Sequence, residues 1–194
     1  MGINMIINYK KREIQIKIVY YGCAMSGKTT SLRSLFRVFN KENLVTSINT
    51  TTGRTLFFDF GILQLKGSEW TVKISLYTAT GQDFYASTRP STLYGIDGIM
   101  FIVDSQRKYF KDNVTSWKEL NFYLQEKIKE LPVVICLNKR DLDDLIDSKE
   151  ISESFGLENN EKIHLIQTIA IESSGILEAF KKILGMIFPS ILVN

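Results

Sequence analysis

The spacing of hydrophobic and polar residues changes along the chain and predicts an alternation of strands and helices. Alternating or continuous apolar runs predict strands, and apolar residues at intervals of three and four predict helices. Two polar stretches, 40–54 and 81–95, show no clear period, and irregular segments of this length in a compact domain are usually functional. The predicted strands are 13–22, 55–66, 70–78, 96–104, 131–138 and 163–168, and the predicted helices are 29–39, 113–129, 148–155 and 175–188.

The order of these elements predicts one α/β domain over residues 1–194. Strands 55–66 and 70–78 are separated only by a turn, so we expect them to form a hairpin. The remaining strands alternate with helices, which is typical of a parallel sheet covered on both faces. We therefore expect a mostly parallel six-stranded sheet with one antiparallel edge strand and helices on both faces.

A complete phosphate-binding motif, GxxxxGK(S/T), lies between the first predicted strand and the first predicted helix. In such a loop the backbone amides surround the phosphates, and the start of the helix adds a favourable dipole. Lys28 can reach the outer phosphates, and the Thr29 hydroxyl can bind Mg²⁺. A nucleoside triphosphate with Mg²⁺ is therefore the expected ligand. The candidate binding residues are Gly22, Cys23, Ala24, Met25, Ser26, Gly27, Lys28, Thr29 and Thr30.

The sequence Asn-Lys-Arg-Asp at 138–141 directly follows a predicted buried strand and indicates guanine as the base. The carboxylate of Asp141 can accept from both N1 and the 2-amino group of guanine, whereas adenine would leave a buried carboxylate unpaired. Lys139 can lay its apolar stem over the base, and Asn138 can tie this loop to the phosphate-binding loop. After the last strand, the backbone amide of Ala170 could donate to guanine O6.

Candidate groups for the reaction follow the strand 70–78. The backbone amide of Gly81 can bind the γ-phosphate, and Gln82 can orient an attacking water. The placement of Gln82 one residue after Gly81 therefore indicates hydrolysis.

Composition excludes several classes of partner and location. The net charge of +3, with no dense basic run, argues against nucleic acid. No apolar run reaches the ~18 residues of a membrane span, and the ends of the chain carry no signal-peptide or lipidation pattern. We expect a soluble cytoplasmic protein without a membrane anchor, recruited to a membrane or pole only through partners.

The two cysteines have no metal-binding or disulfide spacing. Cys23 has two interpretations. A position near the start of a helix could lower its thiol pKa and make it sensitive to oxidation, or it could be a small filler of the loop.

Together these residues resemble the Ras-like small GTPases, and most closely the MglA family of prokaryotic polarity and gliding-motility GTPases. The resemblance rests on KIVYYGxxxSGKTT, GRTLFFDF, LYTxxGQxFY, GIDGIMFIVDS and NKRDL, which occur in the expected order. It implies the phosphate-loop small-GTPase fold, GTP and GDP as ligands, slow hydrolysis of GTP, and activation by a Roadblock-type dimer, MglB. The exchange factor and effectors are unknown.

The resemblance also assigns roles to residues of the irregular segments. Thr55 would be the threonine of switch I, the segment 45–55, that senses Mg²⁺ and the γ-phosphate. Arg54 would be an arginine finger supplied in cis, although a solvated loop charge is the alternative, and Gln82 would position water.

Three departures from the wider pattern affect the site. Thr78 replaces the Asp that holds Mg²⁺ through water in most Ras-like proteins; the MglA family shares this Thr, and Asp59 is a candidate to compensate. Ala24 replaces a usual Gly, so its methyl can crowd the γ-phosphate. Ala79 and Thr80 replace a Val-Pro pair, which can alter how switch II moves.

The aromatic residues near the switches have two interpretations each. Strand alternation puts Phe58 and Phe60 on one face, expected to be core, and Phe57 and Asp59 on the other. The alternative is that these residues form a partner-binding surface on a strand that slides with the nucleotide state. Switch II carries two aromatic residues that are either core or partner anchors. These are Phe84 and Tyr85.

Three functions remain open at this point. The first is a GTP-hydrolysing switch whose segments 45–55 and 79–92 are ordered by the γ-phosphate. The second is a GTP-binding scaffold with little hydrolysis, motivated by Ala24 and Thr78. The third is a kinase or ATPase, which the guanine motif argues against.

Overall fold

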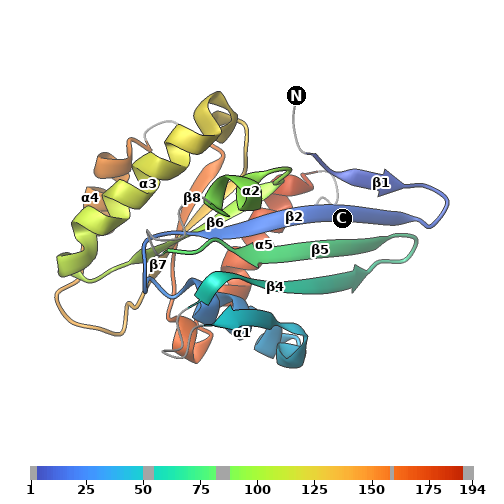
Figure 1. Ribbon diagram of the computed structural model, residues 1–194, viewed down its shortest axis with the longest axis horizontal. Helices are drawn as coiled ribbons and strands as arrows, with labels where there is room; N and C mark the ends of the chain where they lie inside the picture. Colours follow the sequence, from blue (N-terminus) through green and yellow to red (C-terminus); the bar gives the residue numbers. More distant parts are fainter. Residues whose placement is uncertain (1–3, 50–54, 82–87, 158–159, 190–194) are drawn as a thin grey trace.

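The computed structural model describes residues 4–49, 55–81, 88–157 and 160–189, with side chains described outside 47–49 and 55–57. In this part of the chain, one sheet separates two helical layers (Figure 1). Helices α3 (Phe110–Leu124) and α4 (Ser148–Phe155) pack on one face. Helices α1 (Lys28–Val38) and α5 (Ile176–Ile187) pack on the other. The predicted layering is therefore confirmed.

The sheet contains eight strands in the described residues, in the order β3-β4-β5-β2-β6-β7-β8, with β1 paired to β2 outside this path. Strand β2 pairs in parallel with β5 and β6, and β7 pairs in parallel with β6 and β8. The pairs β1–β2, β3–β4 and β4–β5 are antiparallel. The strands are β1 Ile6–Asn8, β2 Glu13–Tyr21, β3 Thr46–Asn49, β4 Thr55–Lys66, β5 Thr71–Thr78, β6 Gly98–Asp104, β7 Val133–Asn138 and β8 Ile163–Gln167.

The predicted class and the β4–β5 hairpin are confirmed, and the sheet gains two strands over the six expected. Strand β1 has three residues and β3 four, too few to show a period. Strand β3 lies within the stretch 40–54 and helix α2 (Arg89–Leu93) within 81–95, the two stretches that lacked a pattern. Short helical turns complete the described elements: η1 Glu42–Leu44, η3 Arg107–Tyr109, η4 Gln125–Lys129 and η5 Ala170–Glu172.

An aromatic cluster attaches α3 and α4 to the sheet. The rings of Trp117 and Phe155 stack at 5.0 Å between centroids, and each meets Phe101 of β6 edge-on. The Trp117 indole N–H donates to the backbone carbonyl of Phe155 at 2.9 Å, so its buried polar atom is satisfied. This cluster fixes α3 against the end of the sheet where the site lies.

Strand β4 turns a different face inward from the one expected. Asp59 and Leu63 are fully buried, and a Cβ on Gly61 would lie 2.4 Å from Cζ of Phe36 on α1. Phe58 and Phe60 are only half-buried and contact the ring of Tyr77. The expectation that Phe58 and Phe60 form the core face is therefore wrong, because α1 packs against the face of Asp59. The Phe57 side chain lies outside the described residues.

The parallel strands bring their carboxyl ends to the same edge of the sheet, at the left of Figure 1. Ligands of open α/β sheets bind at this edge. The loops after β2, β5, β7 and β8 therefore meet there. Within the described ranges, no helix is long and apolar enough to span a bilayer.

Candidate guanine-nucleotide site

The loop between β2 and α1 has a backbone that only glycine tolerates at two points. Gly22 has φ 143° and Gly27 has φ 102°, both in the left-handed half of conformational space. A Cβ on Gly22 would lie 2.2 Å from the Ile102 carbonyl, and one on Gly27 would lie 2.3 Å from the Asn138 amide nitrogen. The loop is therefore a closely fitted cradle, with Met25 and Ala24 on its exposed side.

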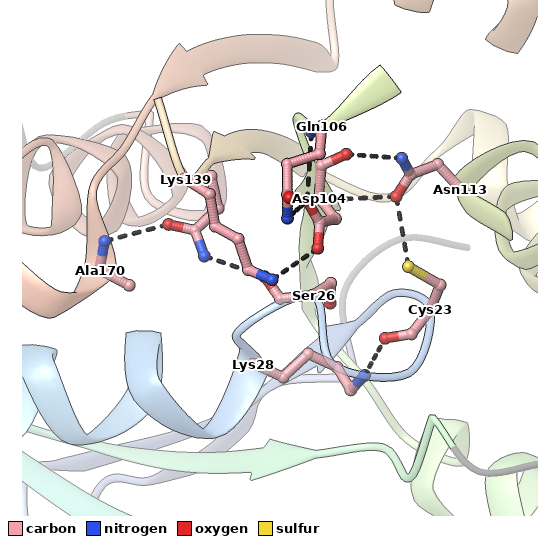
Figure 2. Close-up of polar contacts among 9 residues, drawn as sticks. Cys23, Ser26, Lys28, Asp104, Gln106, Asn113, Lys139 and Ala170 are labelled. Atoms are coloured by element: carbon pink, nitrogen blue, oxygen red, sulfur yellow. Dashed lines mark hydrogen bonds and ion pairs between the residues drawn. The ribbon is translucent and has the colours of Figure 1, made fainter. Parts of the chain in front are cut away.

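Lys28 is buried at the centre of this cradle. Its ammonium donates to the backbone carbonyl of Cys23 at 2.6 Å (Figure 2) and to that of Gly22 at 2.8 Å. Burial lowers the pKa of Lys28 to about 8. A Cβ on Gly81 would lie 2.7 Å from the Lys28 nitrogen and from Ala24 N and Cα, so the loop after β5 closes against the cradle.

The first turn of α1 suits an anion. It contains no acidic side chain among its described residues, so the helix itself supplies no counter-charge to the positive end of its dipole. Together with the glycine cradle and Lys28, this arrangement fits the phosphates of a nucleotide.

A carboxylate from β4 reaches the threonine that the sequence assigned to Mg²⁺. The Thr29 hydroxyl donates to Asp59 Oδ2 at 2.6 Å, and the Thr78 hydroxyl donates to the same oxygen at 2.9 Å. Asp59 is fully buried. Hydroxyl and carboxylate oxygens are the ligands that Mg²⁺ prefers, so these residues fit the ion. Thr55 begins β4, but its side chain lies outside the described residues.

Asn138, the first residue of the guanine motif, joins three loops. Its side-chain amide donates to the Ser26 carbonyl at 2.9 Å, the link to the phosphate-binding loop that we expected. Its oxygen accepts from the Ala170 amide at 3.0 Å and the Thr168 hydroxyl at 3.3 Å. The Ala170 amide, expected to face guanine O6, is therefore directed at Asn138 in this structure.

Lys139 is held by a residue that the sequence did not single out. Its ammonium lies 2.6 Å from Oδ2 of Asp104, a fully buried carboxylate at the end of β6 (Figure 2). It also lies 5.6 Å from the ring centre of Tyr109. Asp104 ends a strand that is otherwise apolar, and this position at the ligand-binding edge was the available signal.

Asn113 of α3 connects both halves of the site. Its oxygen accepts from the Cys23 thiol at 3.4 Å and the Asp104 amide at 3.1 Å, and its amide donates to the Asp104 carbonyl at 2.8 Å (Figure 2). Nothing in its predicted helix marked it for this role, because helical periodicity records apolar positions only.

The surroundings of two single residues bear on their interpretation. Burial raises the pKa of the Cys23 thiol to about 11, which favours the loop filler over the oxidation-sensitive thiolate. Asp141 is exposed rather than buried, because it lies in the surface turn closed by the bond from the Leu142 amide to the Lys139 carbonyl. Thr30, on α1, is also exposed.

Four predicted residues of the switches lie outside the described residues. They are Arg54, Gln82, Phe84 and Tyr85. Gly81, directly before Gln82, is described and lies against the phosphate-binding loop.

Comparisons with known proteins agree with this geometry. The model of the ADP-ribosylation factor family matches residues 3–187. The mutual gliding-motility protein MglA of Myxococcus xanthus is 34% identical over 193 residues, 95% of this chain and 96% of that protein. The Ras-related protein Rab11C of Lotus japonicus is 28% identical over 175 residues, 89% of this chain and 74% of that protein. Rab-11C of Dictyostelium discoideum is 24% identical over 181 residues, 92% of this chain and 75% of that protein. Because the family model covers nearly the whole chain and MglA matches it at this identity, the chain belongs to the ADP-ribosylation factor family of small GTPases, as a member of the MglA group.

Proposed function

We propose that this small GTPase binds GTP and GDP with Mg²⁺ at the edge of the sheet, hydrolyses GTP slowly, and changes the conformation of its two switch segments on hydrolysis. The observation that carries the proposal is the Asn138 side chain, which bonds the guanine motif to the phosphate-binding loop at Ser26. That bond supports the proposal because it ties the segment proposed to read the base to the phosphate-binding loop, as the binding of one nucleotide by both requires.

The residues around the phosphates have separate roles in this proposal. Lys28 exchanges its bonds to backbone carbonyls for bonds to the outer phosphates, which favours its charged form. Thr29 and Asp59 hold Mg²⁺, together with Thr55, and the bound ion neutralises charge on the phosphates. The Gly81 amide binds the γ-phosphate.

The residues around the base recognise guanine. Asp141 accepts from N1 and the 2-amino group, and the bound base covers this exposed carboxylate. The ion pair with Asp104 holds the Lys139 stem in position to cover the base. Asn138 and Ala170 complete the pocket.

Hydrolysis requires two residues of the switch segments. Gln82 orients the attacking water, and Arg54 acts in cis as the arginine finger, an effect of about 10³–10⁵ in rate. A Roadblock dimer of the MglB type brings Arg54 into place, so hydrolysis by the chain alone is slow. The protein acts in the cytoplasm, and its partners recruit it to a membrane or pole.

Nucleotide competition tests the base assignment. We expect the wild-type protein to bind GTP and GDP, and a hundredfold excess of ATP not to compete for the site. That result would exclude the kinase or ATPase alternative. Asp141→Asn should lose guanine affinity and gain affinity for xanthine nucleotides, because xanthine has a carbonyl where guanine has the 2-amino group. Undiminished GDP binding by Asp141→Asn would overturn the guanine assignment.

Single-turnover hydrolysis tests the reaction. A Roadblock dimer from the same genome should accelerate it strongly, and Arg54→Ala and Gln82→Ala should each abolish the acceleration. Acceleration that persists in Arg54→Ala would exclude the cis finger.

The GTP-binding scaffold is the second candidate, and one contact favours it. Gly81 lies close to the Ala24 backbone, since a Cβ on Gly81 would be 2.7 Å from it, and the Ala24 methyl, which a glycine would lack, adds to the crowding proposed beside the γ-phosphate. Bound GTP that is not hydrolysed, even with the dimer present, would favour the scaffold. Ala24→Gly should then restore hydrolysis.

A further inference from the structure

A buried network joins the loop after β5 to α3 and to the strand that enters the phosphate-binding loop. The guanidinium of Arg89, at the start of α2, donates through Nη1 to both carboxylate oxygens of Glu119 on α3, at 2.5 and 2.6 Å. The hydroxyls of Tyr21 and Tyr123 donate to the same carboxylate at 2.8 and 3.3 Å. The Arg89 side chain is 7% exposed and that of Glu119 23%.

Stability alone does not account for this network. Removing an arginine and a carboxylate from water is costly, and well-packed apolar residues of similar volume usually stabilise a fold at least as well. Apolar residues cannot donate a hydrogen bond to a backbone carbonyl. Arg89 can, and its Nε donates to the Thr80 carbonyl at 2.9 Å.

The Thr80 carbonyl belongs to the same peptide unit as the Gly81 amide. That unit is planar, and in the trans form its C=O and N–H point in opposite directions. The described residues contain no cis peptide bond. With the carbonyl directed at Arg89, the Gly81 N–H is directed away from α2, on a residue that lies against Ala24 and Lys28.

We infer that Arg89 is a positioning residue that orients the Thr80–Gly81 peptide, so that the Gly81 amide faces the terminal phosphate of GTP. Glu119 fixes the guanidinium, and Tyr21, directly before Gly22, ties the network to the phosphate-binding loop. The inference rests on the proposed function, since only a bound triphosphate supplies that phosphate. In this inference Arg89 contributes to the preference for GTP over GDP and not to the affinity for nucleotides in general.

The chain offers a matched control. Arg107 and Glu150 form a similar pair, with Nη1 2.6 Å from both carboxylate oxygens, but their side chains are 45% and 36% exposed. Losing this exposed pair should leave nucleotide selectivity unchanged.

The test compares affinities for GDP and for a non-hydrolysable GTP analogue, both with Mg²⁺. The double variant Arg89→Met/Glu119→Met removes the charges together and keeps the volume filled. We expect it to bind the analogue about 10- to 100-fold more weakly, the range for a lost hydrogen bond to a charged group, and GDP within about twofold of wild type. Arg107→Met/Glu150→Met should match wild type for both ligands.

Arg89→Lys is a second variant that keeps the positive charge. A lysine lacks the fork that binds the carboxylate and the carbonyl together, so the analogue should still bind at least about fivefold more weakly. Circular dichroism and urea unfolding establish that each variant is folded.

The outcomes separate this inference from the proposed function. A folded Arg89 variant with the wild-type ratio of the two affinities overturns the inference alone. Equal loss of GDP and analogue affinity also overturns it, because that result indicates a structural role. Wild-type protein that binds neither ligand overturns both.

Discussion

The Thr78 hydroxyl makes two hydrogen bonds to Asp59. It accepts from the Asp59 backbone amide at 2.7 Å and donates to the Asp59 carboxylate at 2.9 Å. Thr78 of β5 therefore orients the carboxylate of Asp59 on the neighbouring strand β4, and that carboxylate also accepts from Thr29. This is the geometry that the expected compensation by Asp59 would require.

Asp59→Asn is expected to weaken the effect of Mg²⁺ on nucleotide binding. Removing the charge next to Thr29 should raise the Mg²⁺ concentration needed to slow GDP release by about 10- to 100-fold. GDP release in excess EDTA should be unchanged. Fluorescent GDP release over a Mg²⁺ titration measures both.

Asp97→Asn is the control for this experiment. Asp97 is also a buried carboxylate that accepts from a strand amide, that of Lys17 at 2.8 Å, but it directly precedes β6, at the opposite end of that strand from the site. It should leave Mg²⁺ dependence as in wild type. If both variants respond alike, Asp59 has no special link to the ion.

Asn138→Ala should weaken GTP and GDP binding equally, by about tenfold or more. The substitution removes the bonds to Ser26, Thr168 and Ala170 and leaves buried polar groups unpaired, at about 1–3 kcal/mol in unfolding free energy. Titration calorimetry and urea unfolding measure the two effects. Asn121→Ala, which loses only a bond to the Trp117 carbonyl, should affect neither affinity. A selective loss of GTP binding would contradict a shared role in both complexes.

The Cys23 thiol should alkylate slowly at neutral pH. Burial raises its pKa to about 11, so at pH 7.5 fewer than about one thiol in a thousand is ionised. The rate with iodoacetamide, followed by mass spectrometry, should rise about tenfold per pH unit up to about pH 11. Cys136, with a pKa raised by burial to about 12, is an internal reference that should react more slowly still. A midpoint near 8.5 for Cys23 would show a normal thiol.

Gly61→Ala should destabilise the fold by about 1–3 kcal/mol, because the new methyl would meet the buried Phe36 ring. Phe36→Leu should relieve part of that cost, so the double variant should be more stable than the sum of the single effects indicates. Gly67→Ala, in the β4–β5 turn, is the comparison: its Cβ would be 3.2 Å from the Trp70 carbonyl, a milder contact than the 2.4 Å at Phe36, so a smaller loss of stability is expected. Additive effects would mean that α1 shifts away from β4.

The sequence predicted what depends on local pattern. Asn138 ends β7, and the loop that leads to Lys28 follows β2; both strands have apolar runs long enough to recognise, so parallel pairing through β6 brings the two motifs together. Which face of β4 is buried could not be predicted, because alternation defines two faces but not the one that α1 covers.

The sequence also could not predict which distant polar residues form hydrogen bonds with one another. Glu119 and Asn113 lie on α3 among other polar residues, and their partners Arg89 and Cys23 lie 30 and 90 residues away in the chain. Only the packing of Trp117 against the sheet decides which polar side chains of that helix turn inward.

A single amide side chain, that of Asn138, belongs at once to the loops that follow β2, β7 and β8. When a ligand orders one of these loops, the other loops therefore lose less conformational entropy when they bind their own ligands. Fragments of the nucleotide should then bind cooperatively: guanosine, which carries no phosphate, would raise the affinity of the empty cradle for pyrophosphate, and pyrophosphate would do the same for guanosine.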